Sequence, residues 1–216
     1  RDLHSFPTRR SSDLYSLSWP ELAGRVRVLA TQLRKLGVKP GDRVVACLPN
    51  IPEAVIAVLA TTSIGAIWSS CGPDFGTRGV LDRFAQLAPK AMLCVDGYQY
   101  GGKPFSRKAE MRNIIGQLPS LERVIYLPYL DPDDRELLSA HTLLWDEMFD
   151  HPPVDAAGFQ FEQVPFNHPL WILFSSGTTG LPKPIVHGHG GILMEQLKLF
   201  HFHADLHARE IGRAHV

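Results

Sequence analysis

The sequence lacks an excess of charge of either sign. Its 22 lysine and arginine residues balance 22 aspartate and glutamate residues, so the formal net charge at pH 7 is zero. A chain of this kind has no general field that attracts a polyanion, and we expect no nucleic acid partner. An anionic ligand would therefore have to be bound by a local arrangement of donors.

Long apolar runs and cysteines are also scarce. The longest clean apolar run, residues 54–60, is far shorter than the roughly 20 residues of a membrane-spanning helix, so we expect no membrane anchor. The three cysteines, Cys47, Cys71 and Cys94, are odd in number and lie in or near apolar segments. This pattern favours buried, reduced thiols over a disulfide framework, and it predicts a cytoplasmic protein.

The two ends of the chain differ from the rest. "RRSSDL" at residues 9–14 can be encoded by DNA that contains GCTCTTCCGATCT, and "EIGRA" at residues 210–214 by DNA that contains its reverse complement. We interpret residues 1–14 as a non-native leader and residues 209–216 as a non-native tail, both translated from a sequencing adapter. A natural basic leader and a frayed tail are the alternative. On the first interpretation, residues 15–208 are natural sequence cut from a longer frame.

Helix and strand signals alternate along the first half of the chain. Helical patterns cover residues 18–36, 51–64, 77–87 and 106–118. Short apolar segments typical of buried strands lie between them, at residues 41–49, 66–69, 90–96 and 123–127. This alternation predicts an α/β fold with a mostly parallel sheet and helices on its faces.

Residues 128–169 interrupt this pattern. Proline, aspartate and histidine are frequent there, and only residues 136–149 carry an apolar repeat. We interpret the segment as a connection with at most one short helix, and its acids as solvated surface groups rather than a metal site. The alternation resumes with strands at residues 170–174 and 184–187 and a helix at about residues 192–199.

A loop of small residues, "SSGTTGLPK" at residues 175–183, follows the strand at residues 170–174. Phosphate oxygens need many short donors and a positive charge, and glycines let the backbone approach them closely. Four hydroxyls, two glycines and Lys183 offer all of these. The Walker A motif does not fit, because Pro182 and Pro184 flank the lysine. On donor count alone, a phosphate loop and a plain connecting turn both stay open.

The loop resembles the signature of the adenylate-forming synthetases, the superfamily of acyl-CoA synthetases, luciferases and peptide-synthetase adenylation domains. Three further stretches narrow the resemblance to the acetoacetate-CoA ligases: "WSSCGPDFG" at residues 68–76, "VDGYQYGGK" at 95–103 and "IVHGHGGIL" at 185–193. Gly72 and Pro184 depart from that pattern, in which serine and alanine are expected. The resemblance implies that residues 15–208 are part of an AMP-binding N-terminal domain.

The resemblance implies a ligation in two steps. A carboxylate attacks the α-phosphate of Mg²⁺-bound ATP to give an acyl adenylate and pyrophosphate, and the thiol of coenzyme A then displaces AMP. Thr179 and Lys183 are the implied catalytic residues. The implied contacts of the ATP phosphates are Ser175, Ser176, Gly177, Thr178, Thr179, Gly180 and Lys183. The adenine, ribose and magnesium contacts and a further catalytic lysine are expected downstream of this chain.

Arg83 is the implied contact of the coenzyme A phosphates, and a solvated helix face is the alternative interpretation. The stretch "GYQYGGK" could cover a pocket or only turn the chain. His187 and His189 could line a pocket or serve in packing. His203 and His207 are one helical turn apart, but no acid or cysteine completes a ligand set, so we expect no metal site.

Two other functions stay open from the sequence. One is a short-chain acyl-CoA synthetase that acts on acetate or propionate, and the other is a non-catalytic module that binds nucleotide phosphates. For either ligase we expect small-molecule substrates, namely ATP, a short-chain acid and coenzyme A, and we expect the fragment alone to be inactive. No pattern in the sequence indicates an oligomeric state.

Overall fold

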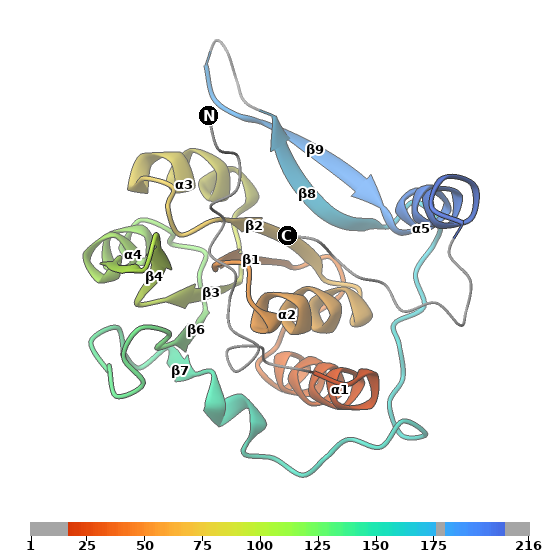
Figure 1. The fold of residues 1–216 in the computed structure, drawn as a ribbon, viewed down its shortest axis with the longest axis horizontal. Helices are drawn as coiled ribbons and strands as arrows, with labels where there is room; N and C mark the ends of the chain where they lie inside the picture. Colours follow the sequence, from red (N-terminus) through yellow and green to blue (C-terminus); the bar gives the residue numbers. More distant parts are fainter. Residues whose placement is uncertain (1–16, 176–179, 206–216) are drawn as a thin grey trace, which may run out of the picture.

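The computed structural model describes residues 17–175 and 180–205 (Figure 1). The strands of its main sheet are β1 (Arg43–Cys47), β2 (Ile67–Cys71), β3 (Ala91–Val95), β6 (Arg123–Leu127), β7 (Thr142–Leu144), β8 (Pro169–Ser175) and β9 (Lys183–Gly188). A separate hairpin consists of β4 (Gly97–Tyr100) and β5 (Lys103–Ser106). The helices are α1 (Trp19–Lys35), α2 (Pro52–Ser63), α3 (Thr77–Phe84), α4 (Lys108–Gly116) and α5 (His189–Lys198). Shorter turns are η2 (Ala85–Leu87), η3 (Asp146–Phe149) and η4 (Leu199–His203).

The seven strands of the main sheet lie in the order β7-β6-β3-β1-β2-β8-β9. Neighbouring strands pair in parallel, except that β8 and β9 form an antiparallel hairpin. The predicted α/β fold with a mostly parallel sheet is confirmed. None of the helices in the described ranges has both the length and the apolar character that crossing a bilayer requires.

Helices cover both faces of the parallel part of the sheet. The helices α1 and α2 lie on one face, and α3 and α4 lie on the other (Figure 1). The side chains of β1 alternate between them: Val44 and Ala46 join the α1–α2 core, whereas Val45 and Cys47 join the α3–α4 core. All four are fully buried, as expected for a central parallel strand. Cys47 and the other two cysteines are buried and free, which confirms the expected reduced thiols.

The last helix begins earlier than the sequence predicts. We expected it at about residue 192, but α5 starts at His189. Two consecutive glycines, Gly190 and Gly191, weaken the helical signal in its first turn. The structure explains the first of them, because a β-carbon on Gly190 would lie 2.1 Å from the ring of Phe166. Close packing therefore places glycine where propensity alone argues against a helix.

The interpretation of residues 128–169 is partly wrong. This connection supplies the expected short helical turn, η3, but it also supplies β7, which extends the sheet in parallel beside β6. With three residues, β7 is too short to show a strand periodicity in the sequence. The acids are not all solvated either, since the side chain of Asp134 is buried.

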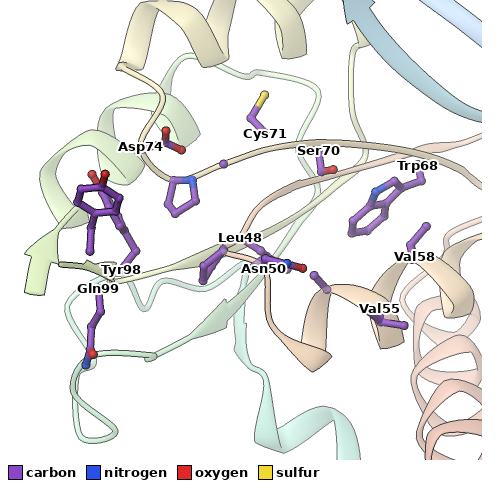
Figure 2. A pocket seen from close by; sticks show the side chains of 15 residues that line it. Leu48, Asn50, Val55, Val58, Trp68, Ser70, Cys71, Asp74, Tyr98 and Gln99 are labelled. Carbon is purple, nitrogen blue, oxygen red and sulfur yellow. The ribbon is translucent and has the colours of Figure 1, made fainter. Parts of the chain in front are cut away.

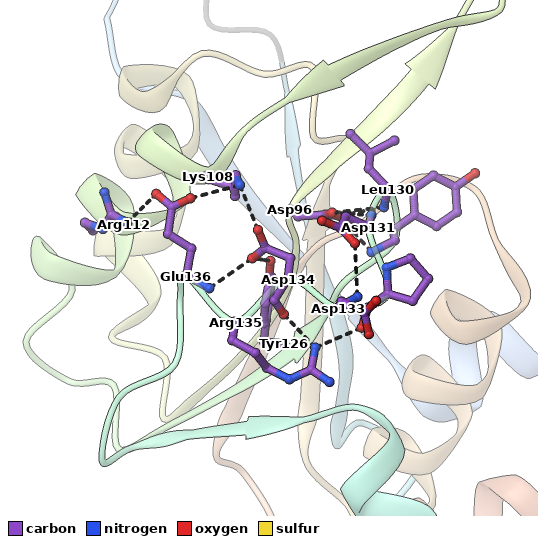
Figure 3. A network of polar contacts seen from close by, with 12 residues as sticks. Asp96, Lys108, Arg112, Tyr126, Leu130, Asp131, Asp133, Asp134, Arg135 and Glu136 are labelled. Atoms are coloured by element: carbon purple, nitrogen blue, oxygen red, sulfur yellow. Dashed lines mark hydrogen bonds and ion pairs between the residues drawn. The ribbon is translucent and has the colours of Figure 1, made fainter.

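Asp134 is the centre of a polar network that joins this connection to β6 and α4 (Figure 3). The hydroxyl of Tyr126 donates to Oδ1 of Asp134 at 2.5 Å, and Nζ of Lys108 donates to Oδ2 at 2.7 Å. Lys108 also pairs with Glu136 at 2.9 Å. A buried carboxylate with such partners is stable in its charged form, whereas an unpaired one would oppose folding.

Asp96, at the carboxyl end of β3, fixes the start of the same connection. Its carboxylate accepts backbone N–H bonds of 2.7 to 3.0 Å from Tyr129, Leu130 and Asp131. The backbone oxygen of Asp96 accepts the N–H of Arg107 at 2.7 Å, which closes the base of the β4–β5 hairpin. Gly97 follows, and a β-carbon there would lie 2.3 Å from the carbonyl oxygen of Phe105. The hairpin base therefore requires glycine at this position.

The Asp134 network predicts how stability depends on pH. Burial opposes ionisation of Asp134, but the hydrogen bonds from Lys108 and Tyr126 outweigh it and hold the pKa of Asp134 below its ordinary value of 3.8. A carboxyl group with a lowered folded-state pKa contributes stability above its unfolded pKa, and this is lost as the pH falls through the folded pKa. We predict that Asp134→Asn lowers the free energy of unfolding at pH 7 by about 1 to 3 kcal/mol.

Urea unfolding at pH 7 and at a series of lower pH values measures this effect, with the exposed neighbour in Asp133→Asn as the control. The difference between the wild type and Asp134→Asn should shrink as the pH falls below about 4. Equal losses of stability in the two proteins over the whole acid range would contradict the proposed network.

Candidate functional site

An open cavity of about 860 Å³ lies at the carboxyl edge of the central strands (Figure 2). Its walls come from β2 and β4, from residues 48–50 and 72–74, which follow β1 and β2, and from one side of α2. The chain leaves β1 towards α2 on one face of the sheet, and it leaves β2 towards α3 on the other. Open α/β sheets form their ligand crevices at such points, because the two connections diverge there.

The lining of this cavity is aromatic and polar. Trp68, Tyr98 and Tyr100 supply flat apolar surfaces, and Asn50 and Gln99 supply amide groups. Among the described residues that line it, Asp74 is the one charged side chain. The cavity therefore suits an organic group with uncharged polar atoms better than a bare phosphate.

The β4–β5 hairpin answers the open question about "GYQYGGK". This stretch both turns the chain and supplies one wall of the cavity through residues 98–100. The rings of Tyr98 and Phe105 stack with centroids 5.4 Å apart, which stiffens the hairpin. Nη2 of Arg107 donates to the carbonyl oxygen of Phe75 at 2.8 Å, so the hairpin base is tied to the loop between β2 and α3.

Part of the predicted phosphate loop lies within the described residues. Ser175 ends β8 and Lys183 begins β9, and the two residues are partners in the antiparallel register. The side chain of Lys183 is exposed. Gly180 has a φ of +111°, a conformation that favours glycine. The other predicted contacts, Ser176, Gly177, Thr178 and Thr179, lie outside the described residues.

Arg83 lies close to this end of the β8–β9 hairpin rather than in the lining of the cavity. Its guanidinium carbon is 4.9 Å from the ring centroid of Phe75 and 6.0 Å from that of Phe174. Its Nη1 donates to the carbonyl oxygen of Gly79 at 2.6 Å. The sequence suggested a coenzyme A contact or a solvated position for this arginine, and the structure adds contacts with two aromatic rings.

The histidines that follow the loop take part in packing. Nε1 of Trp171 donates to Nδ1 of His187 at 2.9 Å. The ring of His189 lies 5.7 Å from that of His168, and burial, followed by the nearby His168, lowers the pKa of His189. Neither His187 nor His189 lines the cavity of about 860 Å³, but His189 lines two smaller cavities, of about 470 and 460 Å³. The contact of His187 with Trp171 favours packing, whereas His189 both contacts His168 and lines a pocket.

No group of three or more histidine, cysteine or acidic side chains is arranged to hold a metal ion within residues 17–175 and 180–205. His203 is described, but His207 lies outside these ranges.

Two polar residues of the cavity, Asn50 and Ser70, were not identified from the sequence, whereas Tyr100 lies in the stretch "GYQYGGK", for which a pocket role was open. Asn50 follows the carboxyl end of β1, and Ser70 lies near the carboxyl end of β2. The rule that ligands bind at the carboxyl ends of parallel strands could have selected these segments. The rule could not have selected the individual side chains. Which of them face the cavity depends on where the β4–β5 hairpin and α2 lie.

Comparisons with known proteins identify the family of the chain and agree with its fold. Residues 4–211 match the sequence model of the family described as AMP-binding enzyme. Acetoacetyl-CoA synthetase of Mus musculus is 43% identical over 202 residues, which are 92% of this chain and 30% of that protein. Acetoacetyl-coenzyme A synthetase of Rhizobium meliloti (strain 1021) is 46% identical over 197 residues, 89% of this chain and 29% of that protein.

A solved structure, acetoacetyl-CoA synthetase from Streptomyces lividans, has a TM-score of 0.83 with this chain at 48% sequence identity. It is matched over 89% of this chain and 28% of its own length. The chain therefore spans about 30% of the length of the curated relatives it matches. Because the family match extends over nearly all of its residues, the chain belongs to the family of AMP-binding enzymes.

Proposed function

We propose that this chain is the phosphate-binding part of an ATP-dependent acid-thiol ligase that activates acetoacetate and transfers it to coenzyme A. One observation carries the proposal: the predicted phosphate loop joins two paired strands beside the carboxyl edge of a parallel sheet, with Ser175 and Lys183 together at its base. The relatives named acetoacetyl-CoA synthetase support the choice of acid. The cytoplasmic location suggested by the buried free thiols stays a prediction.

The loop matters most in the first step of such a reaction, the formation of the acyl adenylate, because charge on the phosphates must be stabilised there. Negative charge is redistributed over the phosphate oxygens as the carboxylate attacks and pyrophosphate leaves, and donors fixed in advance stabilise that charge without reorganisation. An exposed lysine at the base of the loop can approach these oxygens as a mobile point charge. The loop hydroxyls and the backbone N–H groups freed by glycine would complete the set of donors.

Mg²⁺ would reach this site as part of the ATP substrate. The described residues include no acid cluster that could hold the ion by itself. The loop contributes hydroxyl oxygens, which suit Mg²⁺ chemically but usually act together with carboxylates. Holding the phosphates is therefore the role of these residues, and further ligands of the ion would have to come from elsewhere in the longer enzyme.

The cavity at the carboxyl edge fits the organic part of a second substrate. Of the three proposed substrates, coenzyme A has a long arm with amide groups, which matches the uncharged polar atoms of Asn50 and Gln99 and the rings around them. The sequence predicts that Arg83 contacts the coenzyme A phosphates, and KM for coenzyme A in Arg83→Met tests this prediction against a positioning role for the same residue.

The function of Thr179 and Lys183 can be tested in the full-length enzyme that contains this segment. We predict that Thr179→Ala and Lys183→Ala each slow adenylate formation at least about tenfold, because each removes a donor to the developing charge. Exchange of radioactive pyrophosphate into ATP, with acetoacetate and without coenzyme A, measures this step. Lys35→Ala, which removes an exposed lysine at the end of α1, is the control. Unchanged exchange in both loop variants would refute the assignment.

The same assay tests the choice of acid. Acetoacetate should support faster exchange than acetate, propionate or 3-hydroxybutyrate at equal concentration. A wild-type enzyme that prefers acetate or propionate would keep the ligase mechanism but overturn the proposed substrate.

We also predict that the 216-residue chain alone gives no exchange above background, whereas the full-length enzyme is active. The chain spans about 30% of the length of its curated relatives. Part of its surface also exposes large apolar side chains of the kind that proteins usually bury. In the described part of the chain, no residue of α5 is buried, and Leu193, Met194 and Leu197 are each about 60% exposed. Turnover by the isolated chain would contradict the proposal that essential residues lie elsewhere.

A further inference from the structure

The helix α3 contacts Phe174 of β8, and the turn η2 that continues it contacts Pro182, the residue before β9. We propose that Arg83 and Gln86 are positioning residues, which hold the Ser175–Lys183 end of this hairpin in place beside the carboxyl edge of the sheet. The inference rests on the proposed function of the loop, and it assigns these two side chains an action on the ATP-dependent step.

The hairpin end needs such support because the main sheet holds it weakly. Within the described ranges, β8 pairs with β2 in register at a single position, Trp68 with Trp171. The hydroxyl of Ser69 also donates to the carbonyl oxygen of Ile172 at 2.7 Å, one residue further along both strands. Beyond it the hairpin diverges from the sheet (Figure 1). The position of Ser175 then depends on what contacts the strand from outside the sheet.

Arg83 contacts the incoming strand. Its guanidinium lies near the rings of both Phe75 and Phe174, and Phe174 directly precedes Ser175. The hydrogen bond from Nη1 to the carbonyl oxygen of Gly79 fixes the orientation of the planar group. A flat, delocalised cation can contact two aromatic rings at once, which a lysine ammonium cannot do as well.

Gln86 contacts the residue just before the outgoing strand. Its Nε2 donates to the carbonyl oxygen of Pro182 at 3.0 Å and to that of Asp82 at 2.6 Å. Pro182 directly precedes Lys183. Because Gln86 lies three residues after Arg83, the two side chains project from the same side of one helical element. A single helical element therefore contacts both β8 and the residue that precedes β9.

The same contacts connect the hairpin to the large cavity. Phe75, one of the two rings beside Arg83, belongs to the loop between β2 and α3, and residues 72–74 of that loop line the cavity. Arg107 holds the carbonyl oxygen of Phe75 from the other side. Phe75 thus connects the loop that forms part of the cavity wall with the arginine that contacts the β8–β9 hairpin.

The test uses the full-length enzyme with Arg83→Met and Gln86→Met, which keep side-chain length but remove the guanidinium and the amide. Arg78→Met is the control, since this arginine lies on the same helix with its side chain 94% exposed. In pyrophosphate exchange without coenzyme A, we expect kcat/KM for ATP to fall about tenfold in both test variants. The reason is that Ser175 and Lys183 would no longer be held in place to contact the phosphates. KM for coenzyme A in the complete reaction and the thermal unfolding midpoint should match those of the control.

Two results in this assay would overturn the proposal. One is exchange kinetics of both variants equal to those of Arg78→Met. The other is a raised KM for coenzyme A with normal exchange in Arg83→Met, which would show that this arginine binds coenzyme A instead.

A second measurement keeps the inference separate from the proposed function. Amide hydrogen exchange of the 216-residue chain can be followed in a peptide that spans residues 173–183. We expect faster exchange in Arg83→Met and Gln86→Met than in Arg78→Met and the wild type, because the hairpin end loses its contacts with α3 and η2. Equal exchange in all four proteins would overturn the positioning role. A wild-type enzyme without pyrophosphate exchange would instead refute the proposed function and leave this measurement to decide the role of the two residues.

Discussion

The burial of β1 on both faces of the sheet is the constraint on which the rest of the structure depends. Its last four residues are fully buried because helices cover both faces of the sheet. To cover both faces, the chain must leave neighbouring strands in opposite directions, towards α2 after β1 and towards α3 after β2. The gap between these two connections is the cavity. Burying a central strand thus creates the crevice in which a ligand can bind.

The site that results has two parts with different chemistry. The cavity is lined by aromatic rings and amides, whereas the hairpin end offers a hydroxyl and an exposed lysine on paired strands. A ligase that joins an acid to a thiol at the expense of ATP needs both kinds of surface, one for phosphates and one for an organic arm. The contacts of Phe75 with Arg83 and Arg107 hold the two parts together.

The sequence predicts those features that depend on neighbouring residues. Helix starts such as Ser18 before α1, and the buried strands β1, β3 and β6, have local signals, and the structure confirms them. β7 and the buried Asp134 escape prediction because they depend on partners distant in the sequence: β7 pairs with β6, and Asp134 is neutralised by Lys108. The contact of Arg83 with Phe174 is of the same kind, since its partner lies 91 residues further along the chain. The spacing of apolar residues places Arg83 on a helix, but it cannot show that this helix contacts β8.

The central claim is that the base of the loop holds the phosphates of ATP. The most direct test is a crystal structure of the full-length enzyme with a non-hydrolysable ATP analogue. Our account predicts phosphate oxygens within about 3 Å of both Nζ of Lys183 and Oγ of Ser175, which is hydrogen-bonding distance. A triphosphate bound elsewhere, with Lys183 directed into solvent, would contradict it.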